Sequence, residues 1–150
     1  MFRTAKANLV PRPWAVDCLD EVLERMRRPN PHKKAIVFVD NAGSDIVLGM
    51  LPFVRELLKR GTCVVIAANE VPSINDVTAE EMLGIAKSAA AMDPVFSRHL
   101  AEGTFKVVSS GSDLPVIDLA QVLILVLYSA SQPYNCVLTC RTVKIVLNHI

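Results

Sequence analysis

Three residues with oxygen-bearing side chains, Asp40, Asn41 and Asp76, follow hydrophobic runs at two places in the sequence. Carboxylate and amide oxygens suit a hard cation such as Mg²⁺, which commonly keeps further positions for water and substrate phosphate. A cation held there would neutralise phosphate charge and orient the ester for attack. These residue types therefore predict a divalent-metal site for phosphate chemistry. The alternative is that Asp and Asn simply cap the helices that follow them.

Other residues near this set could take part in the same chemistry. The attacking group could be a water molecule or the Asp40 carboxylate itself, and the sequence leaves both routes open. Gly43 and Ser44 could offer backbone N–H groups to a phosphate at the start of the next helix, or form an ordinary tight turn. Asn69 and Asp113 are further candidates for substrate binding, although both residue types are also common in turns.

The elements that must position these residues alternate between buried strands and helices. We predict strands over Ala35–Val39, Cys63–Ala68 and Phe105–Val108, separated by helices over Ile46–Arg60 and Thr78–Met92. This alternation favours parallel strands with right-handed crossovers, which place the loops after the strands at one edge of the sheet. The expected fold class is therefore α/β: a three-layer α/β/α arrangement with a mainly parallel, Rossmann-like sheet, incomplete at its C-terminal end.

Local signals refine the element boundaries. Pro52 lies inside a predicted helix, so we expect a kink there or a shifted helix start. Thr78 with Glu81 three residues later forms the sequence pattern of a capping box. Nearer the amino terminus, residues 1–13 are expected to be an extended lead-in, and apolar residues at helical spacing predict a helix over 14–28.

Composition excludes several classes of protein. Sixteen Lys and Arg against fifteen Asp and Glu give a net charge of +1 over 150 residues, so no global field favours nucleic acid or a membrane surface. The longest apolar run is too short to span a bilayer, and the amino terminus lacks the pattern of a signal peptide. Four scattered cysteines suggest reduced thiols and a cytoplasmic protein. The three histidines are isolated in sequence, and we expect them at the surface.

Several separated segments carry a family resemblance, and they occur in the same order as in that family. The chain resembles the damage-control phosphatase family, the ARMT1-like metal-binding domain also called DUF89, in its plant branch and in the form fused behind pantothenate kinase. The segments that carry the resemblance are residues 9–14, 39–49, 51–58, 69–78 and 109–119.

The resemblance implies a three-layer α/β fold and a divalent-metal-dependent phosphatase. It places the metal ligands and the catalytic chemistry at Asp40, Asn41 and Asp76, with Mg²⁺, Mn²⁺, Co²⁺ or Ni²⁺ as the cofactor. It also implies a small phosphorylated metabolite as substrate, with 4′-phosphopantetheine or its oxidised derivatives as the expected class, in coenzyme A metabolism. A pantothenate kinase domain, fused or associated, is the expected partner.

The carboxyl-terminal part of the chain departs from the family pattern. We expect a partial phosphatase domain over residues 1–121 and a divergent tail over 122–150, because the family's Glu-Gly-Met-Gly-Arg motif and a later lysine are not found there. An alternative reading is a catalytically inactive, truncated isoform that binds metal or partner chains, or self-associates through an open sheet edge. A methyltransferase-like binder is disfavoured, since no glycine-rich loop follows the first predicted strand.

Overall fold

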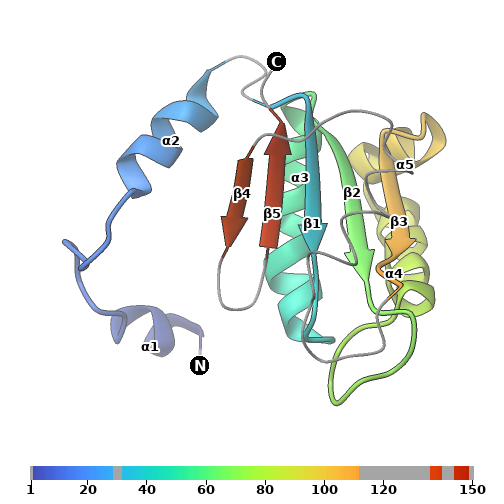
Figure 1. Cartoon of the computed structure of the whole chain (residues 1–150), viewed down its shortest axis with the longest axis horizontal. Coiled ribbons are helices and arrows are strands. Elements are labelled where there is room, and N and C mark those ends of the chain that lie inside the picture. The colour runs from blue at the N-terminus through green and yellow to red at the C-terminus, as the bar shows by residue number, and fades with distance from the viewer. Residues whose placement is uncertain (1, 29–31, 112–135, 140–143, 149–150) are drawn as a thin grey trace. The chain divides into compact units, whose positions relative to one another are not determined.

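The chain divides into two units, which are described separately. The computed structural model describes residues 2–28, 32–111, 136–139 and 144–148 (Figure 1). The first unit comprises Met1–Pro31 and the second His32–Ile150. The second unit contains the sheet and the helices that follow its strands, so it holds the predicted metal ligands.

The second unit is built on a five-stranded mixed sheet. Its strand order is β3-β2-β1-β5-β4, and β1, β2 and β3 run parallel, with Lys34 opposite Cys63 and Val64 opposite Phe105. β5 pairs antiparallel with β1, and β4 pairs antiparallel with β5. The α/β class and the three predicted parallel strands are therefore confirmed. The strands are β1 Lys34–Phe38, β2 Cys63–Ala68, β3 Phe105–Ser109, β4 Cys136–Thr139 and β5 Lys144–Asn148.

The helices of this unit lie together on one face of the parallel strands, behind the sheet as viewed in Figure 1. Two parallel crossovers that proceed in the same direction place their helices on the same side. No described helix of this unit covers the other face, so the second helical layer stays a prediction. Within the described residues, no helix has the length and apolar character that crossing a membrane requires. The elements are the π-helix η1 Asp45–Met50 and the α-helices α3 Leu51–Lys59, α4 Ala79–Met92 and α5 Pro94–Ala101.

The core lies between the parallel strands and these helices. β1 is buried on both faces up to Val39, which is 1% exposed, and β2 contributes the fully buried Val64 and Ile66. Val54 of α3 and Met82 of α4 are each 0% exposed. Strands covered in this way are continuously apolar, so the first polar residue after each one marks the edge of the sheet.

Pro52 shifts the start of α3 rather than kinking a continuous helix. The segment before it is the π-helix η1, in which the Leu51 N–H donates to the Ile46 carbonyl oxygen. Proline has no N–H to donate, and it is tolerated in the first turn of a helix, where Pro52 lies. Single turns of π-helix are frequent beside functional sites. This one begins five residues after Asp40.

Side-chain caps fix the starts of α4 and α5. The predicted capping box is confirmed, since the Glu81 N–H donates to Thr78 Oγ1 over 3.2 Å and the Thr78 N–H donates to Glu81 Oε2 over 2.9 Å. Asp93 then ends α4 and caps α5, accepting a bond from the Val95 N–H over 2.8 Å. The other carboxylate oxygen of Asp93 accepts from Arg55 Nε at 2.6 Å, which ties α3 to this junction.

The expectation of surface histidines was wrong for two of the three. His32 and His99 are 4% and 6% exposed, and His149 lies outside the described residues. His99 Nδ1 lies 2.8 Å from Thr104 Oγ1. Burial lowers the pKa of the His99 imidazole, and the nearby Arg98 adds to that effect. An isolated histidine in a helical pattern gives no sequence signal of this burial.

The first unit differs from its prediction at both of its helices. Residues 2–7 form the helix α1, where an extended lead-in was expected, and the Asn8 N–H donates to the Thr4 carbonyl oxygen over 3.2 Å at its end. The prolines at 11 and 13 are incompatible with the interior of a helix. The second helix, α2, covers Leu19–Arg27 and begins later than the expected residue 14. The residues between the two helices are engaged in a separate set of polar contacts.

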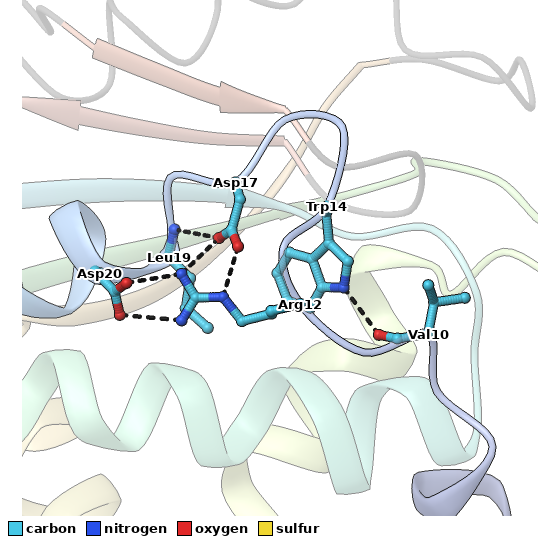
Figure 2. A network of polar contacts seen from close by, with 6 residues as sticks. All are labelled: Val10, Arg12, Trp14, Asp17, Leu19 and Asp20. Atoms are coloured by element: carbon cyan, nitrogen blue, oxygen red, sulfur yellow. Dashed lines mark hydrogen bonds and ion pairs between the residues drawn. The ribbon is translucent and has the colours of Figure 1, made fainter.

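Arg12 organises this set of contacts, which Figure 2 shows. Its guanidinium donates to both oxygens of Asp17, at 2.6 and 2.8 Å, and to both oxygens of Asp20, at 3.0 and 2.8 Å. Trp14 Nε1 donates to the Val10 carbonyl oxygen at 2.9 Å, with the Arg12 guanidinium 5.7 Å from the indole centroid. The hydrogen bonds from Arg12 hold the pKa values of both carboxyls below their usual range. Asp17 also accepts from the Leu19 N–H, at the point where α2 begins.

We predict that Arg12→Lys frays the start of α2. A lysine ammonium cannot make two bidentate contacts, so Asp17 would lose the partner that holds it beside Leu19. Amide hydrogen exchange at Leu19 and Val22 should become several-fold faster, while exchange within β1 stays unchanged. Arg3→Lys, a matched change at another exposed arginine of this unit, should have no effect. Unaltered protection at Leu19 in the Arg12 variant would contradict the assigned role.

Candidate metal centre

The loop after β1 and the loop after β2 are joined directly at Asp40. The Asp40 carbonyl oxygen accepts a hydrogen bond from the Val77 N–H over 2.6 Å. The Asp40 side chain is half-buried, and its Oδ1 accepts from the Asn41 N–H over 2.6 Å. The first of these bonds joins the two loops, and the second orients the carboxylate. The predicted ligand at the end of β1 is therefore held by backbone contacts on both sides.

The structure brings Asp40, Asn41 and Asp76 together. Asn41 and Asp76 form an isolated antiparallel bridge, and the neighbouring Ala42 N–H donates to the Asn75 carbonyl oxygen over 2.8 Å. Parallel β1 and β2 end at the same edge of the sheet, which is why loops so far apart in sequence can meet there. The spatial arrangement that the sequence predicted is present; the metal-binding role of these residues stays a prediction.

The surroundings of the Asp76 side chain disfavour its ionised form. The side chain is half-buried, and its Oδ2 accepts a hydrogen bond from Asn69 Nδ2 over 2.9 Å. Burial raises the pKa of the Asp76 carboxyl, the negative charge of Asp40 raises it further, and the bond from Asn69 opposes both effects. The two carboxylates are therefore close enough to repel each other.

The Asn41 amide is held by a neighbour on each side. Its Oδ1 accepts from Asn75 Nδ2 over 2.7 Å, and its Nδ2 donates to Asp45 Oδ2 over 3.1 Å. An amide oxygen has two acceptor positions, so Oδ1 keeps one for another partner. The structure adds Asp45, the first residue of η1, to the site. Its position four residues after Asn41, at the start of a helix, is the signal that could have identified it.

A cavity of about 260 Å³ opens between this loop and η1. Asp40, Asn41 and Asp45 supply its polar lining, and the remainder is apolar. The cavity therefore places two carboxylates and an amide beside a space large enough for a small polar group with several waters. Its lining residues are Val39, Asp40, Asn41, Asp45, Ile46, Gly49 and Met50.

The chemistry of this donor set fits a hard divalent cation. Asp40 and Asp76 bring two negative charges together, and the charge of Asp40 adds to the burial that raises the pKa of Asp76. Within the described residues, no three His, Cys, Asp or Glu side chains gather into a metal-binding group, so the third donor would be the Asn41 amide oxygen. Carboxylate and amide oxygens are typical ligands of Mg²⁺ and similar ions, not of soft metals.

The other predicted substrate-binding residues are placed differently. Gly43, at φ +72°, and Ser44 are exposed at the start of η1, where the Ser44 side chain caps no backbone group. Asn69 is only 2% exposed and contacts Asp76, so it does not line an open surface. Asp113 lies outside the described residues. Gly43 and Ser44 therefore remain accessible candidates, whereas the structure shows a different contact for Asn69.

A second cavity, of about 600 Å³, lies between η1–α3 and α4. This cavity adjoins the proposed metal ligands, because two of its lining residues, Ala42 and Val77, directly follow Asn41 and Asp76 in sequence. Its lining is mostly apolar, with Glu81 and Ser88 as the polar exceptions. The lining residues are Ala42, Gly43, Val47, Leu51, Val77, Glu81, Gly84, Ile85, Ser88, Ala89 and Met92.

The turn that presents Asp76 contains a strained residue. Ile74 has φ +50°, a left-handed conformation that β-branched side chains rarely adopt, and its side chain is 89% exposed. The Asp76 N–H donates to the Ser73 carbonyl oxygen over 2.8 Å, which closes the turn around it. Because the side chain is exposed, it buries little apolar surface that could offset this strain.

We predict that Ile74→Asn stabilises the chain. Asparagine tolerates the left-handed conformation, so the substitution should raise the free energy of unfolding by about 1 kcal/mol and the melting temperature by about 2–4 °C. Val71→Asn is the matched control, because Val71 is an exposed apolar residue of the same loop with an ordinary φ. If both variants changed the melting temperature equally, backbone strain at Ile74 would not be the cause.

Comparisons with known proteins show the family of this chain. The family model described as the damage-control phosphatase ARMT1-like domain matches residues 1–135. That match runs past residue 121, and the domain boundary expected there stays a prediction. A 4′-phosphopantetheine phosphatase of Mus musculus is 49% identical over 119 residues, which cover 79% of this chain and 14% of the relative.

Two plant relatives extend this comparison. A damage-control phosphatase of Arabidopsis thaliana is 47% identical over 123 residues, covering 81% of this chain and 32% of the relative. Pantothenate kinase 2 of the same plant is 40% identical over 141 residues, covering 77% of this chain and 16% of the relative. The chain therefore spans a third or less of the length of each of these three relatives.

Proposed function

This chain belongs to the damage-control phosphatase ARMT1-like family, and from that premise we propose that it is part of a metal-dependent phosphatase for small phosphometabolites. The proposed substrate class is 4′-phosphopantetheine and its oxidised derivatives, supported by the name of the mouse relative. The observation that carries the proposal is the meeting of Asp40, Asn41 and Asp76 at one edge of the sheet, joined by the Val77–Asp40 backbone bond.

In the proposed mechanism, Asp40, Asn41 and Asp76 hold a divalent cation, with Mg²⁺, Mn²⁺, Co²⁺ and Ni²⁺ as the candidates. When bound, the cation would neutralise phosphate charge and favour attack at phosphorus. Asp40 is oriented by the Asn41 N–H and Asp76 by Asn69, so both carboxylates keep fixed positions. The attacking group is either water, oriented by these carboxylates, or the Asp40 carboxylate itself. In both routes the P–O ester bond breaks and the alcohol leaves; in the second, water then hydrolyses the Asp40 acyl phosphate to release inorganic phosphate.

The accessible start of η1 supports a place for the phosphate. Gly43 and Ser44 are exposed there, next to the proposed ligands in sequence. Gly43 lines the 600 Å³ cavity, whereas η1 lines the 260 Å³ cavity with Asp45 and Met50. The apolar cavity between η1–α3 and α4 adjoins this position and offers room for the uncharged part of a phosphate ester. We assign the phosphate to the position between the two cavities, where Asn41 lines the first and Gly43 the second, and the organic group to the second cavity.

The function is tested by phosphate release from 4′-phosphopantetheine, with p-nitrophenyl phosphate as a general substrate. The chain is stripped with EDTA and then assayed with Mg²⁺, Mn²⁺, Co²⁺ or Ni²⁺ added singly. Metal-stimulated release from 4′-phosphopantetheine is the expected result. Equal release with and without metal would refute the proposed metal dependence, and release only from p-nitrophenyl phosphate would refute the proposed substrate class.

A second candidate function is a non-catalytic module that binds metal or partner chains. It is favoured by large apolar side chains exposed on η1 and at the end of α4, with Leu48 76% and Met92 82% exposed. The partner would be a second copy of this chain or a pantothenate kinase domain, as the plant relative's name suggests. Light scattering tests this reading: a monomer with full metal-stimulated activity would eliminate it.

We also propose that the protein is located in the cytoplasm. Cys18 is exposed and Cys63 half-buried, and both are free thiols. Free thiols support a reducing environment. Fractionation of cells that express the tagged chain would test this, and recovery in an organelle would contradict it.

A further inference from the structure

Asn69 was predicted to bind substrate, but its surroundings assign it another part in the same site. It directly follows β2, where it is 2% exposed. Its carbonyl oxygen accepts a hydrogen bond from the Ala79 N–H over 2.8 Å, and Asn69 forms a parallel bridge with Thr78. The backbone of Asn69 is thereby fixed to the start of α4. A buried residue held in this way is a poor contact for a ligand arriving from solvent.

The Asn69 side chain makes its contact with a proposed metal ligand. Nδ2 donates to Asp76 Oδ2 over 2.9 Å. An ionised carboxylate has several acceptor positions, so a bond to Oδ2 leaves Oδ1 and the remaining positions for a cation. The donor is an uncharged amide, so it orients the carboxylate without neutralising it. A lysine or arginine in its place would remove the negative charge that attracts the cation.

We propose that Asn69 is a positioning residue that holds the Asp76 carboxylate ready for a divalent cation. This inference rests on the proposed function, since it needs Asp76 to be a ligand. Groups that hydrogen-bond to metal ligands fix ligand orientation, and their loss typically costs 10- to 100-fold in metal affinity. Asn69 thus contributes to metal affinity without touching the metal or the substrate.

The test compares two buried polar residues at opposite ends of β2. Asn69→Leu removes the amide donor and keeps a side chain of similar size. Thr62→Val is the matched control, because Thr62 is 1% exposed, directly precedes β2 and donates from Oγ1 to the His32 carbonyl oxygen over 2.8 Å. Mn²⁺ is added to the EDTA-treated chain, and the free ion is followed by electron paramagnetic resonance.

Asn69→Leu should raise the Kd for Mn²⁺ by about 10- to 100-fold, whereas Thr62→Val should leave it unchanged. An unaltered Kd in Asn69→Leu, with a raised KM for 4′-phosphopantetheine, would overturn the inference in favour of substrate binding. Equal weakening in both variants would overturn it in favour of general loosening. If the unaltered chain bound no Mn²⁺, the proposed function would fail and this inference with it.

A second measurement keeps the inference testable if Asn69→Leu does not fold. In the unaltered chain labelled with ¹⁵N, addition of Mg²⁺ should shift the side-chain amide signals of Asn69, because the cation draws charge from the carboxylate that accepts their bond. The Asn41 amide signals should shift as well, and those of Asn8 should not. Shifts at Asn41 with none at Asn69 would show that Asn69 does not act through the metal ligand.

Discussion

Asp40→Ala is expected to lower metal-stimulated phosphate release by about 1,000-fold. The substitution removes one of the two carboxylates proposed as metal ligands, so the cation loses a ligand and part of the negative charge that holds it. The loss of activity is expected for both proposed roles of Asp40, as a metal ligand and as the group that attacks phosphorus. Binding of Mn²⁺ should weaken in parallel, measured by the same resonance signal of the free ion.

The control for Asp40→Ala is Glu80→Gln, which removes an exposed carboxylate from the first turn of α4. It changes the net charge by the same amount at a position outside the proposed site, and should retain full activity. Metal-stimulated hydrolysis that survives in Asp40→Ala would show that the metal lies elsewhere. Equal losses in both variants would indicate a general charge effect.

Asp76→Asn is expected to stabilise the metal-free chain near neutral pH and to abolish its stabilisation by metal. The folded-state pKa of Asp76 is raised above its ordinary value, so the folded chain binds a proton more tightly than the unfolded chain. Stability therefore increases as the pH falls through the raised pKa, and the ionised carboxylate costs stability above it. Asparagine has nearly the same shape and can still accept the bond from Asn69, but it carries no charge.

Melting temperatures measured against pH would check this prediction. In EDTA, the variant should melt higher than the unaltered chain at pH 7, and the difference should shrink as the pH falls toward 4. With Mn²⁺ at about 100 times its Kd, the unaltered chain should gain about 2.7 kcal/mol, while the variant gains far less. The order of the two melting temperatures would then reverse. An unaltered chain that is already the more stable one in EDTA at pH 7 would contradict the repulsion between Asp40 and Asp76.

The parts of the fold that were predictable carry strong local signals. β1 and β2 are continuous apolar runs, and the Thr78–Glu81 capping box fixes the start of α4, so these elements follow from neighbouring residues alone. The meeting of Asp40 with Asp76 followed from parallel topology. Because the carboxyl ends of parallel strands share one edge of the sheet, the order of strands and helices was sufficient.

The parts that could not be predicted depend on contacts distant in sequence or on competition between nearby groups. The late start of α2 reflects Arg12 binding Asp17 and Asp20, whose helical spacing is equally compatible with a longer helix. The burial of Asn69 and its bond to Asp76 arise only once β2 and the following loop fold back together. A polar residue after a strand has the same sequence signature whether it faces solvent or a neighbouring carboxylate.

The proposed ligands all lie between Asp40 and Asp76, a stretch that contains η1, α3 and β2, and the Val77–Asp40 bond closes it. The entropy cost of closing a loop grows only slowly with its length, and the three proposed ligands all precede α4 in the chain. During synthesis the complete donor set therefore emerges from the ribosome before β3 does. A cation could engage the nascent chain at that stage, and the later strands would then assemble on a segment that is already cross-linked.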